Sequence, residues 1–180
     1  MSNDVPAMWM RGGTSKGLYF LKNDLPSNKV ERDKFLLSIF GSPDRLQING
    51  IGGGNPLTSK VAIISKSKKP DIDIDYLFLQ VSVDNTLVSD TQNCGNILAG
   101  IAPFAIERGL VKPKYGHGET SVKIYMENTK QMAIASVQTP KGKITYKGET
   151  YIDGVPKPSS PISLEFLNIA GSLCGDLLPT

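Results

Sequence analysis

The sequence has 180 residues, of which 39% are hydrophobic and 21% charged, a composition typical of a folded domain. The net charge of +3 is too small and too scattered for a nucleic-acid-binding surface, two cysteines exclude a disulfide scaffold, and one histidine argues against a histidine-based metal site. No apolar run reaches the roughly 18 residues of a membrane span, and the first ten residues lack the pattern of a secretory signal. We therefore expect a cytoplasmic protein with no membrane partner.

The first predicted elements are two strands around a glycine-rich turn. Apolar runs at residues 5–10 and 18–21 flank this turn, which is the pattern of a β-hairpin. Residues 30–40 then mix apolar and charged side chains and are followed by Gly41, which predicts an amphipathic helix. The glycine-rich residues 49–60 are predicted to form a loop. The remaining strands are predicted at residues 61–64, 76–83, 120–128, 131–139, 143–147 and 162–166.

Residues 94–108 are the most informative element, because they predict a helix without a polar stripe. A helix that is apolar on every side has to be buried on every side. We expect Pro103 to kink this helix and Gly109 to end it. Many short strands and one buried helix predict an α+β fold, in which a strongly twisted, barrel-like mixed sheet wraps around the helix. Helices do not alternate with strands, so a parallel Rossmann arrangement fits poorly.

Cys94 lies at the predicted start of the buried helix, between Asn93 and Gly95. The first amides of a helix lack intrahelical partners and carry partial positive charge, an environment that favours the thiolate of a cysteine. The same amides can hold a carboxylate or a developing oxyanion, and a glycine lets a ligand approach the backbone. The alternative interpretation is a buried and chemically inert cysteine.

Lys60 follows a loop that contains three consecutive glycines and enters a predicted strand. There it could act as an amine base if it is desolvated, although a lysine is more commonly a surface residue. The glycines lack the spacing of a phosphate-binding loop. Arg11, with the glycines and hydroxyls that follow it, could clamp a carboxylate, or it could face solvent from a hairpin turn.

Other polar residues carry less information. His117 lies between two glycines and is predicted to be a turn residue, and Cys174 has no supporting motif. The alternating aspartates at 71, 73 and 75 are predicted to approach a strand in solvent and not to bind a metal.

Three segments together resemble a known family. They are residues 10–17 (MRGGTSKG), 50–60 (GIGGGNPLTSK) and 93–96 (NCGN). In order and spacing they resemble the methylaconitate cis–trans isomerase family, which includes 4-oxalomesaconate tautomerase and methylitaconate isomerase and looks like a branch of the diaminopimelate-epimerase fold. The resemblance runs from about residue 8 to the end of the chain.

The resemblance implies two similar lobes, each a curled sheet around a central helix, with the active site between them. It also implies an allylic proton shift, without cofactor or metal, on an unsaturated di- or tricarboxylate such as methylaconitate or 4-oxalomesaconate. Lys60 and Cys94 fall on the family's catalytic lysine and cysteine. The positions that fall on segments lining the substrate pocket are Arg11, Gly12, Gly13, Thr14, Ser15, Gly53, Gly54, Asn55, Ser59, Gly95 and Asn96.

Residues 1–180 correspond to the N-terminal lobe alone, so we expect a single lobe, with little activity by itself. The protein partners that fit such a lobe are another copy of the chain, in a homo-oligomer, or a second lobe. One alternative function is an epimerase or racemase of the same fold. The other is an inactive lobe that binds carboxylates or a partner protein.

Overall fold

The computed structural model describes residues 4–113 and 116–167. The strands are β1 (Met8–Gly12), β2 (Ser15–Leu21), β3 (Lys60–Lys66), β4 (Ile74–Val81), β5 (Val88–Ser89), β6 (Glu119–Met126), β7 (Gln131–Gln138) and β8 (Ile162–Leu167). The α-helices are α1 (Lys29–Phe40), α2 (Gly95–Leu98) and α3 (Ile101–Glu107). Short 3-10 helices are η1 (Lys22–Asp24), η2 (Pro56–Thr58) and η3 (Pro140–Gly142).

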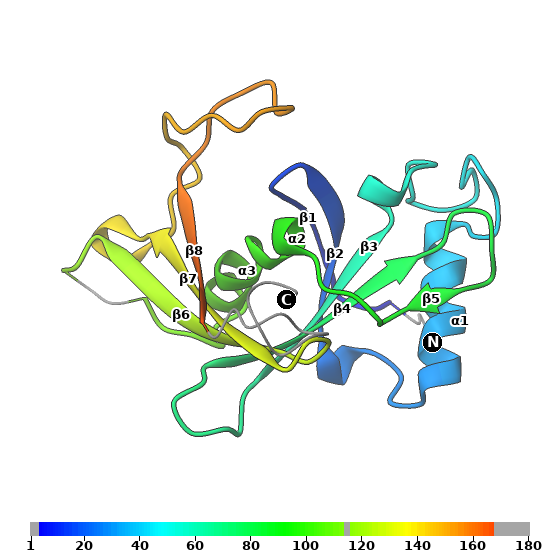
Figure 1. The fold of residues 1–180 in the computed structure, drawn as a ribbon, viewed down its shortest axis with the longest axis horizontal. Coiled ribbons are helices and arrows are strands. Elements are labelled where there is room, and N and C mark those ends of the chain that lie inside the picture. The colour runs from blue at the N-terminus through cyan, green and yellow to red at the C-terminus, as the bar shows by residue number, and fades with distance from the viewer. Residues whose placement is uncertain (1–3, 114–115, 168–180) are drawn as a thin grey trace, which may run out of the picture.

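The described strands form one mixed sheet in the order β1-β2-β3-β4-β6-β7-β8, with the short β5 paired beside β4. The β2–β3 and β4–β6 pairs are parallel, and the other pairs are antiparallel. The sheet is strongly curled, so that β6, β7 and β8 face β1 and β2 across α2 and α3 (Figure 1). The predicted α+β fold, with a sheet wrapped around a helix, is confirmed.

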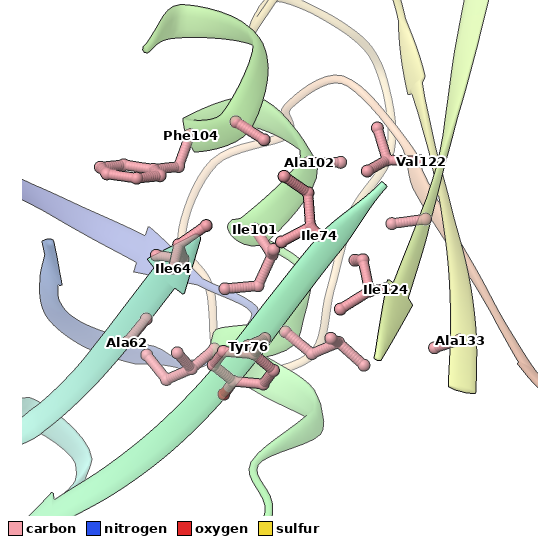
Figure 2. Packing of buried hydrophobic residues seen from close by; sticks show 14 of the residues in the cluster. Ala62, Ile64, Ile74, Tyr76, Ile101, Ala102, Phe104, Val122, Ile124 and Ala133 are labelled. Carbon is pink, nitrogen blue, oxygen red and sulfur yellow. The ribbon is translucent and has the colours of Figure 1, made fainter. Parts of the chain in front are cut away.

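The inner face of the sheet and the two enclosed helices share one apolar core. Figure 2 shows side chains of α3 packed between β3 and β4 on one side and β6 and β7 on the other. The fully buried residues from the helices include Ile97, Leu98, Ile101, Ala102 and Ala105. Because both helices present apolar side chains to strands around them, their burial defines the centre of the fold.

The predicted kink at Pro103 is wrong, because the helix breaks earlier, at Ala99 and Gly100, between α2 and α3. Pro103 is in the first turn of α3, where a backbone amide has no intrahelical partner to lose. The Tyr19 hydroxyl donates a hydrogen bond to Ile97 O at 2.8 Å, and a Cβ at Gly100 would lie 2.3 Å from that hydroxyl oxygen. A tyrosine from β2 therefore occupies the break.

The outer face of β2, β3 and β4 is buried as well, because α1 covers it (Figure 1). The Asn28 side chain accepts from the amides of Val30 and Glu31 at the start of α1, and Gly41 ends the helix with a φ of 79°. Side chains that pack in this outer cluster are Leu18, Phe20, Leu25, Leu36, Phe40, Val61, Ile63, Leu79, Val81 and Val88. The start of β3 is thus held between two apolar layers.

The predicted strand at residues 143–147 is wrong. Its alternation is suitable for a strand, but both edges of β7 are already paired, to β6 and to β8. Part of the segment between β7 and β8 instead projects away from the body (Figure 1). Its contacts include a β-bridge between Thr150 and Ser159 and a hydrogen bond from Ser160 N to Tyr146 O. The other predicted strands and the first helix are confirmed, with bounds shifted by a few residues.

We predict that Ile101→Ala lowers the free energy of unfolding by about 2 to 5 kcal/mol, because it leaves a cavity in the middle of the core. Val30→Ala, at a side chain that is 61% exposed on α1, serves as the control and should change it by less than about 0.5 kcal/mol. Urea unfolding followed by circular dichroism measures both. Equal losses for the two variants would contradict the placement of α3 at the centre.

Candidate active site

Lys60 and Cys94 are 34 residues apart in the sequence, yet Lys60 Nζ lies 3.6 Å from Cys94 Sγ. Lys60 is the first residue of β3, and Cys94 is the N-cap residue of α2. Lys60 is 9% exposed and is therefore not the ordinary surface lysine that its residue type favours. Cys94 is half-buried and is not in a disulfide. The fold therefore brings an amine and a sulfur into contact where the central helix begins.

Strand pairing on both sides fixes the position of Lys60. Its backbone is paired with Gly17 of β2 and with Gln80 of β4. Lys60 Nζ also lies 5.2 Å from the centre of the Phe78 ring, within the distance of a cation–π interaction. The five ion pairs of residues 4–113 and 116–167 do not include Lys60, so its amine has no carboxylate partner among them.

Gln80, which the sequence analysis did not single out, is the main polar partner of Lys60. Its Oε1 accepts a hydrogen bond from Lys60 Nζ at 3.1 Å. Its Nε2 donates to the carbonyl oxygens of Pro56, Ser59 and Val81 at 3.1, 2.9 and 3.3 Å. The Gln80 amide therefore connects the lysine to the end of the glycine-rich loop.

A second glutamine, Gln47, organises the glycine-rich loop. Gln47 is 1% exposed, and its Oε1 accepts from Gly54 N and from Ser59 Oγ, both at 2.9 Å. A Cβ at Gly52 would lie 2.0 Å from Gln47 Oε1, so only a glycine allows the loop to close on this side chain. Gln47 thus ties the loop to the residue immediately before Lys60.

The rest of the loop is held by local contacts. Asn55 Oδ1 accepts from Leu57 N at 2.8 Å and caps η2, and a Cβ at Gly53 would lie 2.6 Å from Thr58 Oγ1. Gly53, Gly54, Asn55 and Ser59 were predicted to line a substrate pocket. Their contacts show how the loop keeps its shape beside Lys60, and their role towards a substrate stays a prediction.

The β1–β2 turn rests directly on the first turn of α2. A Cβ at Gly12 would lie 2.2 Å from Asn96 O, and a Cβ at Gly13 would lie 2.2 Å from Asn96 Oδ1. Gly13 also has a φ of 51°, which favours glycine in a two-residue turn. Asn96 Nδ2 donates to Thr14 Oγ1 at 3.0 Å. Two of the three sequence segments therefore touch each other next to Cys94.

Arg11 and Ser15 flank this turn. Arg11 donates to Gly13 O at 2.6 Å and to Ser159 Oγ at 3.2 Å, so its guanidinium joins the turn to the segment before β8. Arg11 also lines a mainly apolar cavity of about 460 Å³ together with Pro103 and other residues. Ser15 is 1% exposed, and within residues 4–113 and 116–167 its Oγ has no hydrogen-bond partner.

The surroundings of Cys94 leave one side open. Asn93 Oδ1 accepts from Cys94 N at 2.8 Å, and Cys94 O accepts from Leu98 N at 2.9 Å. A Cβ at Gly95 would meet nothing within 4 Å. Since the first amides of a helix lack intrahelical partners, the open space at Gly95 among the described residues leaves room for a ligand beside the first backbone amides of α2.

Two buried phenols lie close enough to Cys94 to respond to its charge. Burial raises the pKa of Tyr19 and of Tyr76 above the usual value, and a negative charge on Cys94 adds to both increases. The Tyr19 hydroxyl has a partner in Ile97 O, whereas the fully buried Tyr76 hydroxyl has no hydrogen-bond partner among the described residues. Both phenols therefore stay protonated at neutral pH.

The remaining candidate positions contribute little to this site. His117 is exposed in a turn, as predicted, and Cys174 lies outside the described residues. Asp73 accepts from Lys123 N, and Asp75 pairs with Lys69.

Within residues 4–113 and 116–167, no group of three histidine, cysteine or acidic side chains is arranged to hold a metal ion. No helix of that part of the chain is long and apolar enough to cross a membrane.

The fold is shared with a solved enzyme. A crystal structure of methylitaconate-delta-isomerase superposes with a TM-score of 0.91 at 45% identity, covering 97% of this chain and 44% of that one. This likeness confirms the curled mixed-sheet fold, which is consistent with the expected diaminopimelate-epimerase-like fold. A sequence profile described as "PrpF protein" matches residues 2–180, so the chain belongs to the PrpF family.

Curated relatives extend over the same region. The chain is 61% identical over 178 residues to (4E)-oxalomesaconate Delta-isomerase of Novosphingobium sp. (strain KA1), covering 99% of this chain and 49% of that protein. It is 54% identical to 4-oxalomesaconate tautomerase of Pseudomonas putida, with 98% and 48% covered. It is 46% identical to 3-methylitaconate isomerase of Eubacterium barkeri, with 98% and 46% covered. The chain spans about half the length of these relatives, and the family expected from the sequence is confirmed.

We predict that Tyr76→Phe raises the free energy of unfolding at pH 7 by about 1 kcal/mol, because it removes a buried hydroxyl without a partner. A raised pKa in the folded state means that the native chain keeps the phenol proton when the unfolded chain releases it. The free energy of unfolding therefore keeps its full value below about pH 10, the usual pKa of an unfolded tyrosine. Above that pH it falls by about 1.4 kcal/mol per pH unit for each such tyrosine. Tyr76→Phe should make this alkaline loss less steep.

Urea unfolding between pH 7 and pH 11 measures both effects. Tyr19→Phe is the matched control, since it removes one alkaline contribution but also breaks the hydrogen bond to Ile97 O. It should lower stability at pH 7, whereas Tyr76→Phe should not. A Tyr76→Phe chain that is less stable at pH 7 and equally sensitive to alkali would contradict the isolated position of this hydroxyl.

Proposed function

We propose that this chain supplies the lysine and cysteine of an isomerase that moves a double bond in an unsaturated di- or tricarboxylate by an allylic proton shift, without a cofactor. The contact of 3.6 Å between Lys60 Nζ and Cys94 Sγ carries the proposal. The substrate class is supported by relatives whose names specify oxalomesaconate, methylitaconate and methyl-aconitate. The cytoplasmic location expected from the sequence belongs to the same proposal.

An amine and a thiol in contact are suited to this reaction. A C–H bond that is conjugated to a carboxylate is a very weak acid, so its cleavage needs a positioned base and stabilisation of the enolate-like intermediate. One proton shared by Lys60 and Cys94 gives either ammonium with thiolate or amine with thiol. In the first form the ammonium is the acid and the thiolate is the base, and in the second form the thiol is the acid and the amine is the base. Either form therefore contains one acid and one base.

The proton balance closes within the pair. The base removes a proton from one allylic carbon, and the electron pair of that C–H bond moves into the conjugated system. The acid then delivers its proton to the carbon at the other end, and the double bond takes its new position. A proton transfer between the two groups over 3.6 Å restores the starting form. No oxidant, reductant or water is consumed.

The polar groups around the pair are suited to an anionic substrate. Thr14 and Asn96 lie beside Cys94, and the space in front of Gly95 is open. Backbone amides at the start of α2 can stabilise the negative charge that develops on a substrate carboxylate. Arg11 would reach a carboxylate only by exchanging its bonds to Gly13 or Ser159.

The proposal includes a second lobe. The chain covers 49% of the Novosphingobium isomerase and 48% of the Pseudomonas tautomerase, so about half of each enzyme has no counterpart in it. We assign to this missing half the closure of the open side at Gly95 and the remaining substrate contacts. The isolated 180-residue chain should therefore turn over substrate slowly or not at all.

We predict that a chimera, in which residues 1–180 replace the matching half of the Novosphingobium isomerase, incorporates deuterium from heavy water at an allylic carbon. The substrates to assay are 4-oxalomesaconate, 3-methylitaconate and 2-methyl-aconitate. Lys60→Ala and Cys94→Ser should each lower the rate by about 100- to 10,000-fold, the usual contribution of a positioned acid or base. Proton NMR follows both exchange and double-bond movement.

Lys34→Ala is the control, because Lys34 is an exposed lysine on α1 and should leave the rate unchanged. Full activity of Lys60→Ala or Cys94→Ser would contradict the proposed pair. Deuterium incorporation at a stereocentre without movement of the double bond would instead identify an epimerase.

A further inference from the structure

The orientation of the Gln80 side-chain amide is determined by its surroundings. Three carbonyl oxygens, from Pro56, Ser59 and Val81, lie within 3.3 Å of Gln80 Nε2. Carbonyl oxygens only accept hydrogen bonds, so the NH2 group has to face them. The opposite orientation would set an oxygen against three oxygens and an NH2 group against the Lys60 amine. The oxygen of Gln80 therefore faces Lys60.

This acceptor restricts a side chain that is otherwise flexible. A lysine side chain has four rotatable carbon–carbon bonds and a strongly hydrated head group. Here Gln80 Oε1 at 3.1 Å and Cys94 Sγ at 3.6 Å hold the nitrogen from two directions. The centre of the Phe78 ring lies 5.2 Å from the same nitrogen. Because Gln80 is paired with Lys60 in the sheet, the same register that begins β3 places the acceptor.

The charge of this acceptor matters as much as its position. The titratable side chains on the inner face of the elements packed against Lys60 are Cys94, Tyr19 of β2 and Tyr76 of β4. The two phenols are neutral at physiological pH, and the Gln80 amide is neutral at every pH. A carboxylate at the place of Gln80 Oε1 would hold the amine as ammonium.

We propose that Gln80 is a positioning residue: it orients Lys60 against Cys94 and, because it is neutral, leaves the amine free to exchange its proton with the sulfur. This inference rests on the proposed acid–base role of Lys60. It adds to the site a residue of β4, the strand paired with β3, that lies outside the three sequence motifs. Gln80 also connects the pair to the glycine-rich loop, through Ser59 O.

The test is an NMR titration of the Lys60 amine in the 180-residue chain with 13C at the ε-carbon of lysine. Lys60→Met identifies the signal by its loss. Gln80→Glu should raise the titration midpoint of this signal by about 1 to 3 pH units, as an adjacent opposite charge does. Gln80→Met, which keeps the length but removes the acceptor, should lower it, because the charged amine loses a hydrogen bond.

Gln131→Glu is the matched control. It adds the same charge at the start of β7, on a strand that is not paired with β3, and should leave the Lys60 midpoint unchanged. Thermal unfolding of each variant confirms that the chain is folded. A Lys60 titration curve that is the same in the unaltered chain, Gln80→Glu and Gln80→Met would overturn the inference.

The chimera with the Novosphingobium half adds a readout of activity. If Gln80 positions Lys60, the pH profile of kcat/KM in Gln80→Glu should move to higher pH together with the NMR midpoint. The substitution should change kcat by a larger factor than KM, because it acts on the acid–base step. A pH profile that stays in place while the NMR midpoint moves would overturn the role of Gln80 in the reaction.

The two proposals fail in different ways. If the chimera without further substitutions has no isomerase activity, the proposed function is refuted. The NMR shifts would still measure how Gln80 acts on Lys60. Activity that depends on Lys60 together with an unaltered NMR midpoint would refute the role of Gln80 alone.

Discussion

A buried amine without a carboxylate partner among the described residues is the constraint on which the site depends. Removing a charged ammonium from water costs several kcal/mol unless other groups replace the lost hydrogen bonds. At Lys60 these groups are an amide oxygen, a sulfur and an aromatic face. The amide and the aromatic ring are neutral, and the sulfur becomes neutral when it accepts a proton. The arrangement therefore tolerates both protonation states of the amine, which is what an acid–base group needs.

The architecture explains why such an arrangement keeps its shape. β3 is buried on its inner face by α2 and α3 and on its outer face by α1 (Figure 1). Lys60 is the first residue of this doubly covered strand, and its backbone is paired with strands on both sides. Cys94 is fixed by the contact of the β1–β2 turn with Asn96, which requires glycine at positions 12 and 13. The glycines of the sequence motifs thus allow close packing as well as turns.

Much of the fold could be predicted from local patterns. Alternation identified β4, and a fully apolar run identified the enclosed helix, because burial on one or all sides leaves a direct trace in the sequence. The break at Gly100 left no such trace, since it depends on Tyr19 from a distant strand. The false strand at residues 143–147 had the right alternation, but both edges of the preceding strand β7 are paired with other strands, β6 and β8.

For the site, the motifs identified Lys60 and Cys94 but not the residues that hold them. Gln80 continues the alternation of β4 and has the pattern of an ordinary strand residue, so its contact with Lys60 becomes visible only through the β3–β4 register. Gln47 lies in an irregular segment after α1, where its polarity suggests exposure, although it is almost fully buried. Polar residues that satisfy other buried polar groups have no periodic signal of their own.

The most direct test of the account is chemical and needs no substrate. o-Phthalaldehyde joins an amine and a thiol into a fluorescent isoindole where both groups lie within reach of one reagent molecule. Isoindole fluorescence is expected in the unaltered chain and in Cys174→Ser, and it should be lost in Lys60→Met and in Cys94→Ser. Fluorescence that persists without Lys60, or that never forms in the unaltered chain, would contradict the contact between Lys60 and Cys94.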